Sequence, residues 1–333
     1  MTFEVLEPGL LTTVQDAGRP DWTHLGVPVG GACDPWSYAV ANLLAGAEAG
    51  SAALEMTIVG PTLVVREPVT VGLAGADLGG VVRETGHRLP PGASYLLAAG
   101  QTIAFPGGDP DAGARAYLAV GSGLEVPMAL GSRSTLVSAG LGGIGGRAIR
   151  AGDVIRQRAE SSVRERRWPW LHGDPFVRPG RDGSTTTLRV VPGPSAGIEA
   201  LLATTWRVRP DSDRVGLRLE ARDPDRSPAL SGTGELLTHG VVTGAIQLPP
   251  GGTPLVLLAD HQTTGGYPVA GVVARADHPA LGQLAPGSAV RFVAVTPDEA
   301  RAAFLEQAAA FAGGAAALDA SDPWDELSDA AGG

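Results

Sequence analysis

The chain has 333 residues, a net charge of −10 and 44% hydrophobic residues, which predicts a folded protein with room for two ordinary domains. The acidic balance argues against a nucleic-acid partner, because nucleic acid binds basic surfaces. All 25 residues in the Lys+Arg count are arginine, so Walker A, Schiff-base and biotin-attachment lysines are excluded.

Neither a membrane anchor nor a cysteine-based site is indicated. No apolar run approaches the ~20 residues that a membrane-spanning helix needs. Residues 1–10 include Glu4, where a secretion signal would be basic and then apolar. The single cysteine, Cys33, excludes an intrachain disulfide and a multi-cysteine metal site. We therefore expect a cytoplasmic protein with no membrane partner and no metal site.

Many short strands are predicted in the first half, because 48 Gly and 27 Pro in the chain separate short apolar runs. One helix is expected after the second strand: Asp34 can cap it, Pro35 suits its first turn and Gly46 ends it. The expected strands cover residues 3–6, 10–14, 53–58, 62–65, 69–73, 94–98, 102–105, 114–120 and 153–156.

A boundary is predicted at residues 158–185, where turn residues and low periodicity indicate a linker. On either side, residues 100–123 and 244–266 share a strand, a Pro-Gly-rich turn, a buried strand and a polar loop. Such internal similarity predicts duplicated β-barrels; two independent β-domains with similar turns are the alternative. We expect a mainly β protein with barrels at residues 1–157 and 186–296 and a few short helices.

The C-terminal region, residues 297–333, is expected to start as a helix over residues 297–312. Its Ala-rich sequence begins with acidic residues that suit a first helical turn. Beyond Gly313 the sequence becomes acidic, and we expect a mobile tail unless Trp324 and Leu327 dock.

Three polar segments are candidates for a functional site. The first, residues 15–37, is a Gly/Pro-rich loop that leads into the predicted helix, whose N-terminal N–H groups and dipole favour anions. For Asp34 taken alone, an ordinary helix cap is the favoured interpretation. The candidates in this loop are Gln15, Asp16, Arg19, His24, Asp34 and Ser37.

The second segment, residues 191–220, places Asp211, Asp213 and Arg214 in a turn before a predicted strand. Asp213 and Arg214 are candidates for substrate or nucleotide binding. A solvated turn, in which the acids satisfy backbone groups, is an open alternative.

The third segment, residues 255–268, runs from four apolar residues into a polar strand end. Polar groups presented by a rigid strand end are typical of binding and catalytic sites. His261 is the best acid–base candidate, since imidazole titrates near neutral pH. The candidates here are Asp260, His261, Gln262, Thr263, Thr264, Gly265, Gly266 and Tyr267.

Other motifs are set aside. The glycine-rich run at residues 140–146 has no lysine and no helix pattern after it, which favours a hairpin or flap over a nucleotide loop. His239 and His278 are isolated and are interpreted as surface or packing residues.

Five ordered stretches resemble signatures of one family. They are residues 15–46, 53–63 (ALEMTIVGPTL), 190–194 (VVPGP), 210–220 (PDSDRVGLRLE) and 240–273. Over about residues 1–295 the chain is similar to the allophanate hydrolase subunit 2 family, also called the biotin-dependent carboxyltransferase-like family. Members of that family include the C subunit of 5-oxoprolinase.

The resemblance implies tandem cyclophilin-like β-barrels and ATP as a co-substrate, together with Mg²⁺. It implies a carboxyltransferase-like companion, the B subunit of 5-oxoprolinase, with the A subunit for full lactam cleavage. The implied reaction converts 5-oxo-L-proline, ATP and water to L-glutamate, ADP and phosphate. A biotin-dependent urea or amide carboxyltransferase component and a non-catalytic regulator of a kinase-inhibitor-like partner are the alternatives. The chain departs from the family at Asp21, where Gly is expected, and at Ser195, where Gln is frequent. Without lysine, it cannot itself carry biotin.

The residues suggest a mechanism in which Arg19 and Arg214 hold carboxylate or phosphoryl oxygens. His261 would transfer a proton or polarise the amide, while Asp260 and Gln262 orient neighbouring groups. Gly265 and Gly266 would supply backbone donors. This hypothesis requires loops from both halves of the chain to meet at one site.

Overall fold

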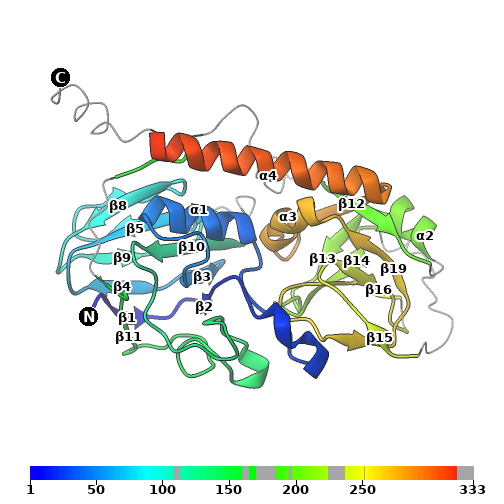
Figure 1. Cartoon of the computed structure of the whole chain (residues 1–333), viewed down its shortest axis with the longest axis horizontal. Coiled ribbons are helices and arrows are strands. Elements are labelled where there is room, and N and C mark those ends of the chain that lie inside the picture. Colours follow the sequence, from blue (N-terminus) through cyan, green and yellow to red (C-terminus); the bar gives the residue numbers. More distant parts are fainter. Residues whose placement is uncertain are drawn as a thin grey trace.

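The computed structural model describes residues 1–108, 113–159, 165–169, 185–194, 197–223, 237–250 and 252–320. Figure 1 shows the two halves of the chain side by side, with the long helix α4 (Pro297–Ala320) lying across both. This described part is mainly β, and none of its helices is long and apolar enough to span a membrane.

The first half forms two antiparallel sheets around one apolar core, to which β-branched and aromatic strand residues contribute. The six-stranded sheet has the order β11 (Val154–Ile155), β1 (Phe3–Glu7), β4 (Thr62–Val65), β9 (Thr102–Ala104), β6 (Val81–Val82) and β7 (His87–Arg88). The five-stranded sheet has the order β2 (Leu11–Gln15), β3 (Ala53–Thr57), β10 (Arg115–Val120), β5 (Val69–Gly75) and β8 (Ala93–Leu97). The strands predicted from sequence are confirmed, with ends that differ by one or two residues.

Helix α1 (Pro35–Ala45) covers the five-stranded sheet and confirms the predicted helix. Asp34 caps its first turn, and Gly46 ends it with a φ of 81°. The helix lies very close to β5: a Cβ on Gly72 would stand 2.0 Å from the Ala41 carbonyl oxygen, so only glycine fits there.

The second half forms a closed seven-stranded barrel with its own apolar core. The barrel closes through a parallel pair, in which Leu188 lies beside Phe292. Its strand order is β12 (Thr186–Pro192), β19 (Val269–Val273), β16 (Ala245–Gln247), β17 (Leu255–Leu257), β14 (Gly216–Ala221), β13 (Trp206–Val208) and β20 (Ala289–Ala294).

The remaining elements, from both halves, are η1 (Pro20–Leu25), η3 (Val137–Ala139), α2 (Ile198–Ala203), β15 (His239–Gly240), β18 (Thr264–Gly265), η5 (Arg275–Asp277) and α3 (His278–Gln283).

The two halves differ in their strand pairing, and their duplication stays a prediction. In the second half, β16 pairs with β17, whereas the corresponding β9 and β10 belong to different sheets. One barrel is therefore confirmed, and the first half is a pair of sheets.

Helix α4 is longer than predicted. It begins with a capping box, in which the Glu299 carboxylate accepts from Thr296 N at 2.7 Å and Thr296 Oγ1 accepts from Glu299 N at 3.2 Å. It continues through Gly313 and Gly314 to Ala320, because Leu318 is buried against the first half of the chain. Packing overrides the low helix propensity of the two glycines. Trp324 and Leu327 lie outside the described residues.

Residues 165–169, inside the predicted linker, pack against the first half. Ser94 N donates to Arg166 O at 2.9 Å, and Arg166 N donates to Ser94 Oγ at 2.7 Å. The Trp168 ring is buried, with its centroid 5.6 Å from that of Phe311 on α4. This segment therefore attaches the end of α4 to the edge of the sheet.

Candidate functional site

The two halves meet where β17 ends. Gly30, in the first polar loop, donates its N–H to Ala259 O at 3.0 Å, and Asp260 N donates to Arg214 O at 2.9 Å. Loops from both halves therefore come together beside Asp260 and His261, as the sequence hypothesis requires.

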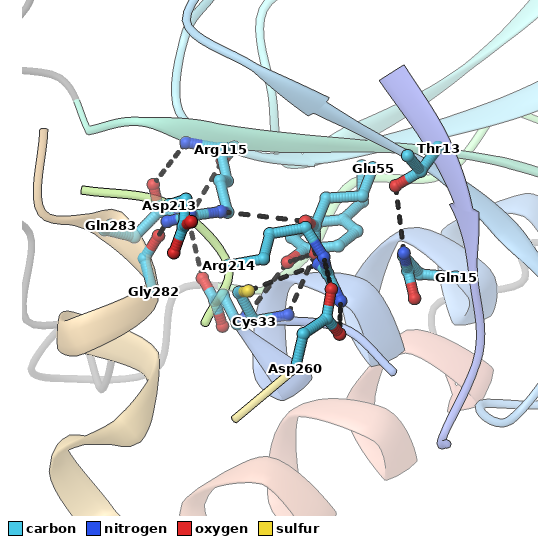
Figure 2. A network of polar contacts seen from close by, with 12 residues as sticks. Thr13, Gln15, Cys33, Glu55, Arg115, Asp213, Arg214, Asp260, Gly282 and Gln283 are labelled. Carbon is cyan, nitrogen blue, oxygen red and sulfur yellow. Dashed lines mark hydrogen bonds and ion pairs between the residues drawn. The ribbon is translucent and has the colours of Figure 1, made fainter. Parts of the chain in front are cut away.

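Arg214 is the centre of a buried polar network that joins the halves (Figure 2). Its Nε and Nη2 each donate to the Asp260 carboxylate at 2.9 Å, a bidentate pair. Nη2 also donates to Gly31 O at 2.7 Å, and Nη1 reaches the Glu55 carboxylate and Cys33 Sγ, the latter at 3.2 Å. Burial by itself lowers the pKa of the Arg214 guanidinium, but the surrounding acidic groups raise it well above its ordinary value. Every side-chain nitrogen of Arg214 donates a hydrogen bond within the protein. Arg214 therefore joins the two halves, and we do not propose that it contacts substrate.

Glu55 on β3 is the first-half partner of this network, and sequence reasoning missed it. Its carboxylate accepts from Tyr117 Oη at 2.7 Å and from Cys33 N at 2.9 Å, and it lies 3.6 Å from Arg115 Nε. Burial raises the pKa of Glu55, but Arg214 and Arg115 together hold it below its ordinary value. The available signal was a charged residue inside an apolar strand, which is rarely buried without a partner.

Cys33 is a neutral thiol in this network. Burial raises its pKa to about 11, despite the nearby Arg214 guanidinium. A thiol that does not ionise near neutral pH is a poor nucleophile. We therefore give Cys33 a packing role.

Asp34 and Ser37, predicted as ligand-binding, belong to the start of α1. Asp34 Oδ1 accepts from Ser37 N at 3.0 Å, and Oδ2 accepts from Ser37 Oγ at 2.6 Å and from Gln283 Nε2 at 2.7 Å. Gln283 also donates to Arg115 O at 2.9 Å, so the cap becomes a second connection between the halves. The sequence preference for Asp34 as a cap is confirmed.

Arg19 lies in the join with one open nitrogen. Its side chain is 2% exposed, Nε donates to Ala129 O at 3.4 Å and Nη2 donates to Ser134 O. Nη1 has no acceptor among the described residues. A Cβ on Gly30 would stand 3.2 Å from Nη1 and 3.8 Å from Asp260 Oδ1, which places the guanidinium near that carboxylate. Burial lowers the pKa of Arg19, against the raising effect of the Asp16 and Asp260 charges.

Gln15 and Asp16 bind the loop that follows β10. Gln15 Nε2 donates to Thr13 Oγ1 at 2.9 Å and to Thr135 O at 3.1 Å, while its Oε1 is buried without a donor among the described residues. Asp16 accepts from Ser132 Oγ at 2.6 Å. Both side chains are thus engaged inside the protein rather than facing solvent.

His261 is buried and positioned as a neutral imidazole. Its Nδ1 lies 2.5 Å from Gln262 O, and because a carbonyl only accepts, Nδ1 carries the proton and Nε2 is the acceptor. Burial lowers the pKa of His261. The ring therefore has a basic Nε2 at neutral pH, as a general base requires.

The rest of the third segment folds back over the strand end. Gln262 Nε2 donates to Gln247 Oε1 at 3.0 Å, and the Gln247 side chain is fully buried. Thr263 O accepts from Val241 N at 3.0 Å. Strand β18, formed by Thr264 and Gly265, pairs with β15 outside the barrel. Gly266 is half-buried and Tyr267 is exposed.

Two predicted site residues, His24 and Asp213, make none of these contacts. His24 is exposed on η1. Asp213 is exposed and accepts from Val215 N at 2.8 Å, the solvated turn that the sequence left open. His239 is exposed and His278 is half-buried, where desolvation lowers the pKa of His278 to about 4, so both fit the surface and packing roles expected for them.

Comparison with known proteins gives a consistent family. Residues 25–294 match the family described as carboxyltransferase domain, subdomain A and B. The C subunit of 5-oxoprolinase from Escherichia coli (strain K12) is 32% identical over 318 residues, covering 92% of this chain and 95% of that protein. Urea amidolyase of Lachancea kluyveri is 30% identical over 90% of this chain but only 17% of that protein. The crystal structure of TTHA0988 has a TM-score of 0.76 and 35% identity, covering 88% of this chain and 56% of that one.

Proposed function

This chain belongs to the carboxyltransferase domain, subdomain A and B family, and we propose that it is the C subunit of an ATP-dependent 5-oxoprolinase. We favour the C-subunit role because the likeness to the Escherichia coli protein covers nearly the whole length of both chains. Urea amidolyase, in contrast, has more than four fifths of its length outside the matched region. The chain would act with two further components, the B and A subunits of such an enzyme.

The observation that supports the site assignment is that Arg19 and Asp260 both lie beside Gly30 between the halves, with His261 next to Asp260 in the chain. Arg19 offers one buried, unpaired nitrogen to an anion, and His261 offers a neutral Nε2. A lactam with a carboxylate, such as 5-oxo-L-proline, needs both a cationic anchor and a proton acceptor. Asp260 accepts two hydrogen bonds from Arg214, and we give it the role of holding the end of β17 in place rather than a chemical role.

ATP has a physical purpose in this reaction, since phosphorylating the lactam oxygen makes the ring carbon open to attack. Among the described residues, the start of α1 is not free for a phosphate. The N-terminus of α1, which could bind an anion, is already occupied by the Asp34 carboxylate. We therefore assign ATP to the assembled complex and give this chain binding of the lactam and movement of its proton.

The decisive experiment is reconstitution. The chain is co-expressed with the proteins encoded beside it, and glutamate release from 5-oxo-L-proline is measured with and without ATP. ATP-dependent release that disappears without this chain supports the proposal. Carboxylation of urea by a biotin-bearing partner would replace it with the carboxyltransferase function. Tight association with a partner and no turnover of either substrate would indicate the regulator.

A further inference from the structure

A strained hairpin stands beside Arg19. Ala129 and Ser132 pair through two backbone hydrogen bonds of 2.7 and 3.3 Å, and the two residues between them, Leu130 and Gly131, have φ values of 54° and 79°. Glycine adopts this left-handed conformation freely, but a leucine there costs about 1–2 kcal/mol. Contacts outside the turn must therefore hold the hairpin in place.

Asp16 supplies those contacts. Its Oδ1 accepts from Ser132 Oγ at 2.6 Å, and its Oδ2 accepts from Arg133 N at 2.5 Å. Ser132 Oγ in turn accepts from Ser134 N at 3.0 Å. Asp16, Ser132 and Ser134 are all buried, so water does not compete for these bonds.

The hairpin then fixes Arg19. The carbonyl oxygens of Ala129 and Ser134 accept from Nε and Nη2 of the guanidinium, and Nη1 is buried without an acceptor among the described residues. Gly30 packs closely against this side of the guanidinium, because a Cβ there would stand 2.9 Å from Ser134 Oγ and 3.2 Å from Nη1. Asp16 lies three residues before Arg19 and accepts from Gly18 N at 2.9 Å, and both Asp16 and the Arg19 guanidinium contact a loop more than a hundred residues away.

We propose that Asp16 is a positioning residue, which fixes the hairpin at residues 129–132 so that Arg19 directs its free Nη1 towards a ligand carboxylate. Asp16 itself touches no ligand. Only the identity of that ligand as a lactam carboxylate rests on the proposed function. The hairpin, Asp16 and Arg19 all belong to this chain, so the isolated chain is sufficient for the first test.

The first test uses the isolated chain. Exchange of arginine Nε–H protons is followed by NMR, with the Arg19 signal identified by its loss in Arg19→Lys. Asp16→Asn replaces one of the two accepting carboxylate oxygens by an NH₂ group, which cannot accept from Arg133 N. Because the hairpin then loses a contact, we expect the Arg19 Nε–H to exchange roughly tenfold faster or more. The Arg214 Nε–H is the internal control and should not change. An unchanged Arg19 exchange rate in a folded Asp16→Asn chain overturns the proposal.

Two further variants serve as an alternative test and as a control. Ser132→Ala removes a single hydroxyl from the same connection, so it tests the proposal if Asp16→Asn fails to fold, and the same faster exchange is expected. Leu130→Asn is the matched control in the same hairpin. Asparagine accepts the left-handed conformation, and the contacts to Asp16 and Arg19 do not use the Leu130 side chain. Leu130→Asn should leave Arg19 exchange as in the wild type.

The second test uses the assembled complex and a matched substrate pair: 5-oxo-L-proline and 2-pyrrolidinone, the same lactam without the carboxylate. Asp16→Asn and Ser132→Ala should lower the preference for the carboxylate substrate, measured as the ratio of the two kcat/KM values, roughly tenfold. The change should appear as a higher KM for 5-oxo-L-proline alone. A parallel loss for both lactams would show a general structural role and overturn the positioning claim. A complex that turns over neither lactam removes the proposed function, while the exchange experiment still decides the role of Asp16.

Discussion

The buried network between the halves predicts a large and specific cost for one conservative change, Glu55→Gln. The glutamine keeps the size of the side chain but removes the charge that pairs with Arg214 and lies 3.6 Å from Arg115. Arg115 then has no carboxylate partner among the described residues, although both arginines stay buried. Removing one member of a buried ion pair costs about 3–5 kcal/mol, because the remaining charge is neither hydrated nor compensated.

The matched control is Glu4→Gln. Glu4 also forms a hydrogen-bonded ion pair, with Arg66 Nε at 2.9 Å, but that pair lies on the surface. Exposed pairs contribute only about 0–1 kcal/mol. Urea unfolding followed by far-ultraviolet circular dichroism should thus separate the variants: Glu55→Gln loses several kcal/mol and Glu4→Gln remains near the wild type.

The pH dependence gives an independent check of the same reasoning. The pKa of Glu55 is lowered in the folded protein, so its charge stabilises the fold above the unfolded pKa, about 4.3. That contribution is lost as the pH falls through the folded value. The difference in unfolding free energy between wild type and Glu55→Gln should have its full size at pH 6 and become smaller below about pH 4. A gap under about 1 kcal/mol at neutral pH would refute a charge-paired join between the halves.

Three other predictions follow from single contacts. His261→Ala should cut turnover of the assembled complex sharply with normal folding. Because burial lowers the pKa of His261, wild-type turnover should hold at pH 7 and fall only as the pH drops below the ordinary value of 6.5; unchanged turnover in His261→Ala would remove its role. In α4, Gly314→Ala should lower the Tm, since its Cβ would stand 2.4 Å from a Trp168 ring carbon. Gly313→Ala, on the exposed side of the same turn, should stabilise by about 0.5–1 kcal/mol, and calorimetry that finds the same sign for both glycines would contradict this packing. Leu130→Asn should raise stability by roughly 1 kcal/mol in urea unfolding, through relief of its left-handed backbone; no gain would show that the hairpin is unstrained.

Local signals predicted much of the fold. The helix at residues 35–45 follows from Asp34, Pro35 and Gly46, and each acts on backbone groups within one turn. The strands follow from short apolar runs bounded by Gly and Pro. The same signals did not show how the strands pair. The similar stretches at residues 100–123 and 244–266 take different partners in the structure.

For the site, the sequence identified the polar strand end at Asp260 and His261 and the loop with Arg19. It did not distinguish residues that face a ligand from residues that hold the protein together. Arg214 and Asp34 are as polar as Arg19, yet their contacts are filled by Glu55, by Asp260 and by Gln283.

The sequence by itself therefore determined the elements, the absence of lysine chemistry and the polar segments, because these depend on residue type and on neighbours a few positions away. Only the tertiary structure decided which charges are paired. Glu55 and Arg214 are 159 residues apart in the chain, and Arg19 takes its acceptors from carbonyl groups 110 and 115 residues away. Such contacts depend on how the two halves, each with its own core, are brought together, and no local pattern in the sequence encodes contacts over such separations.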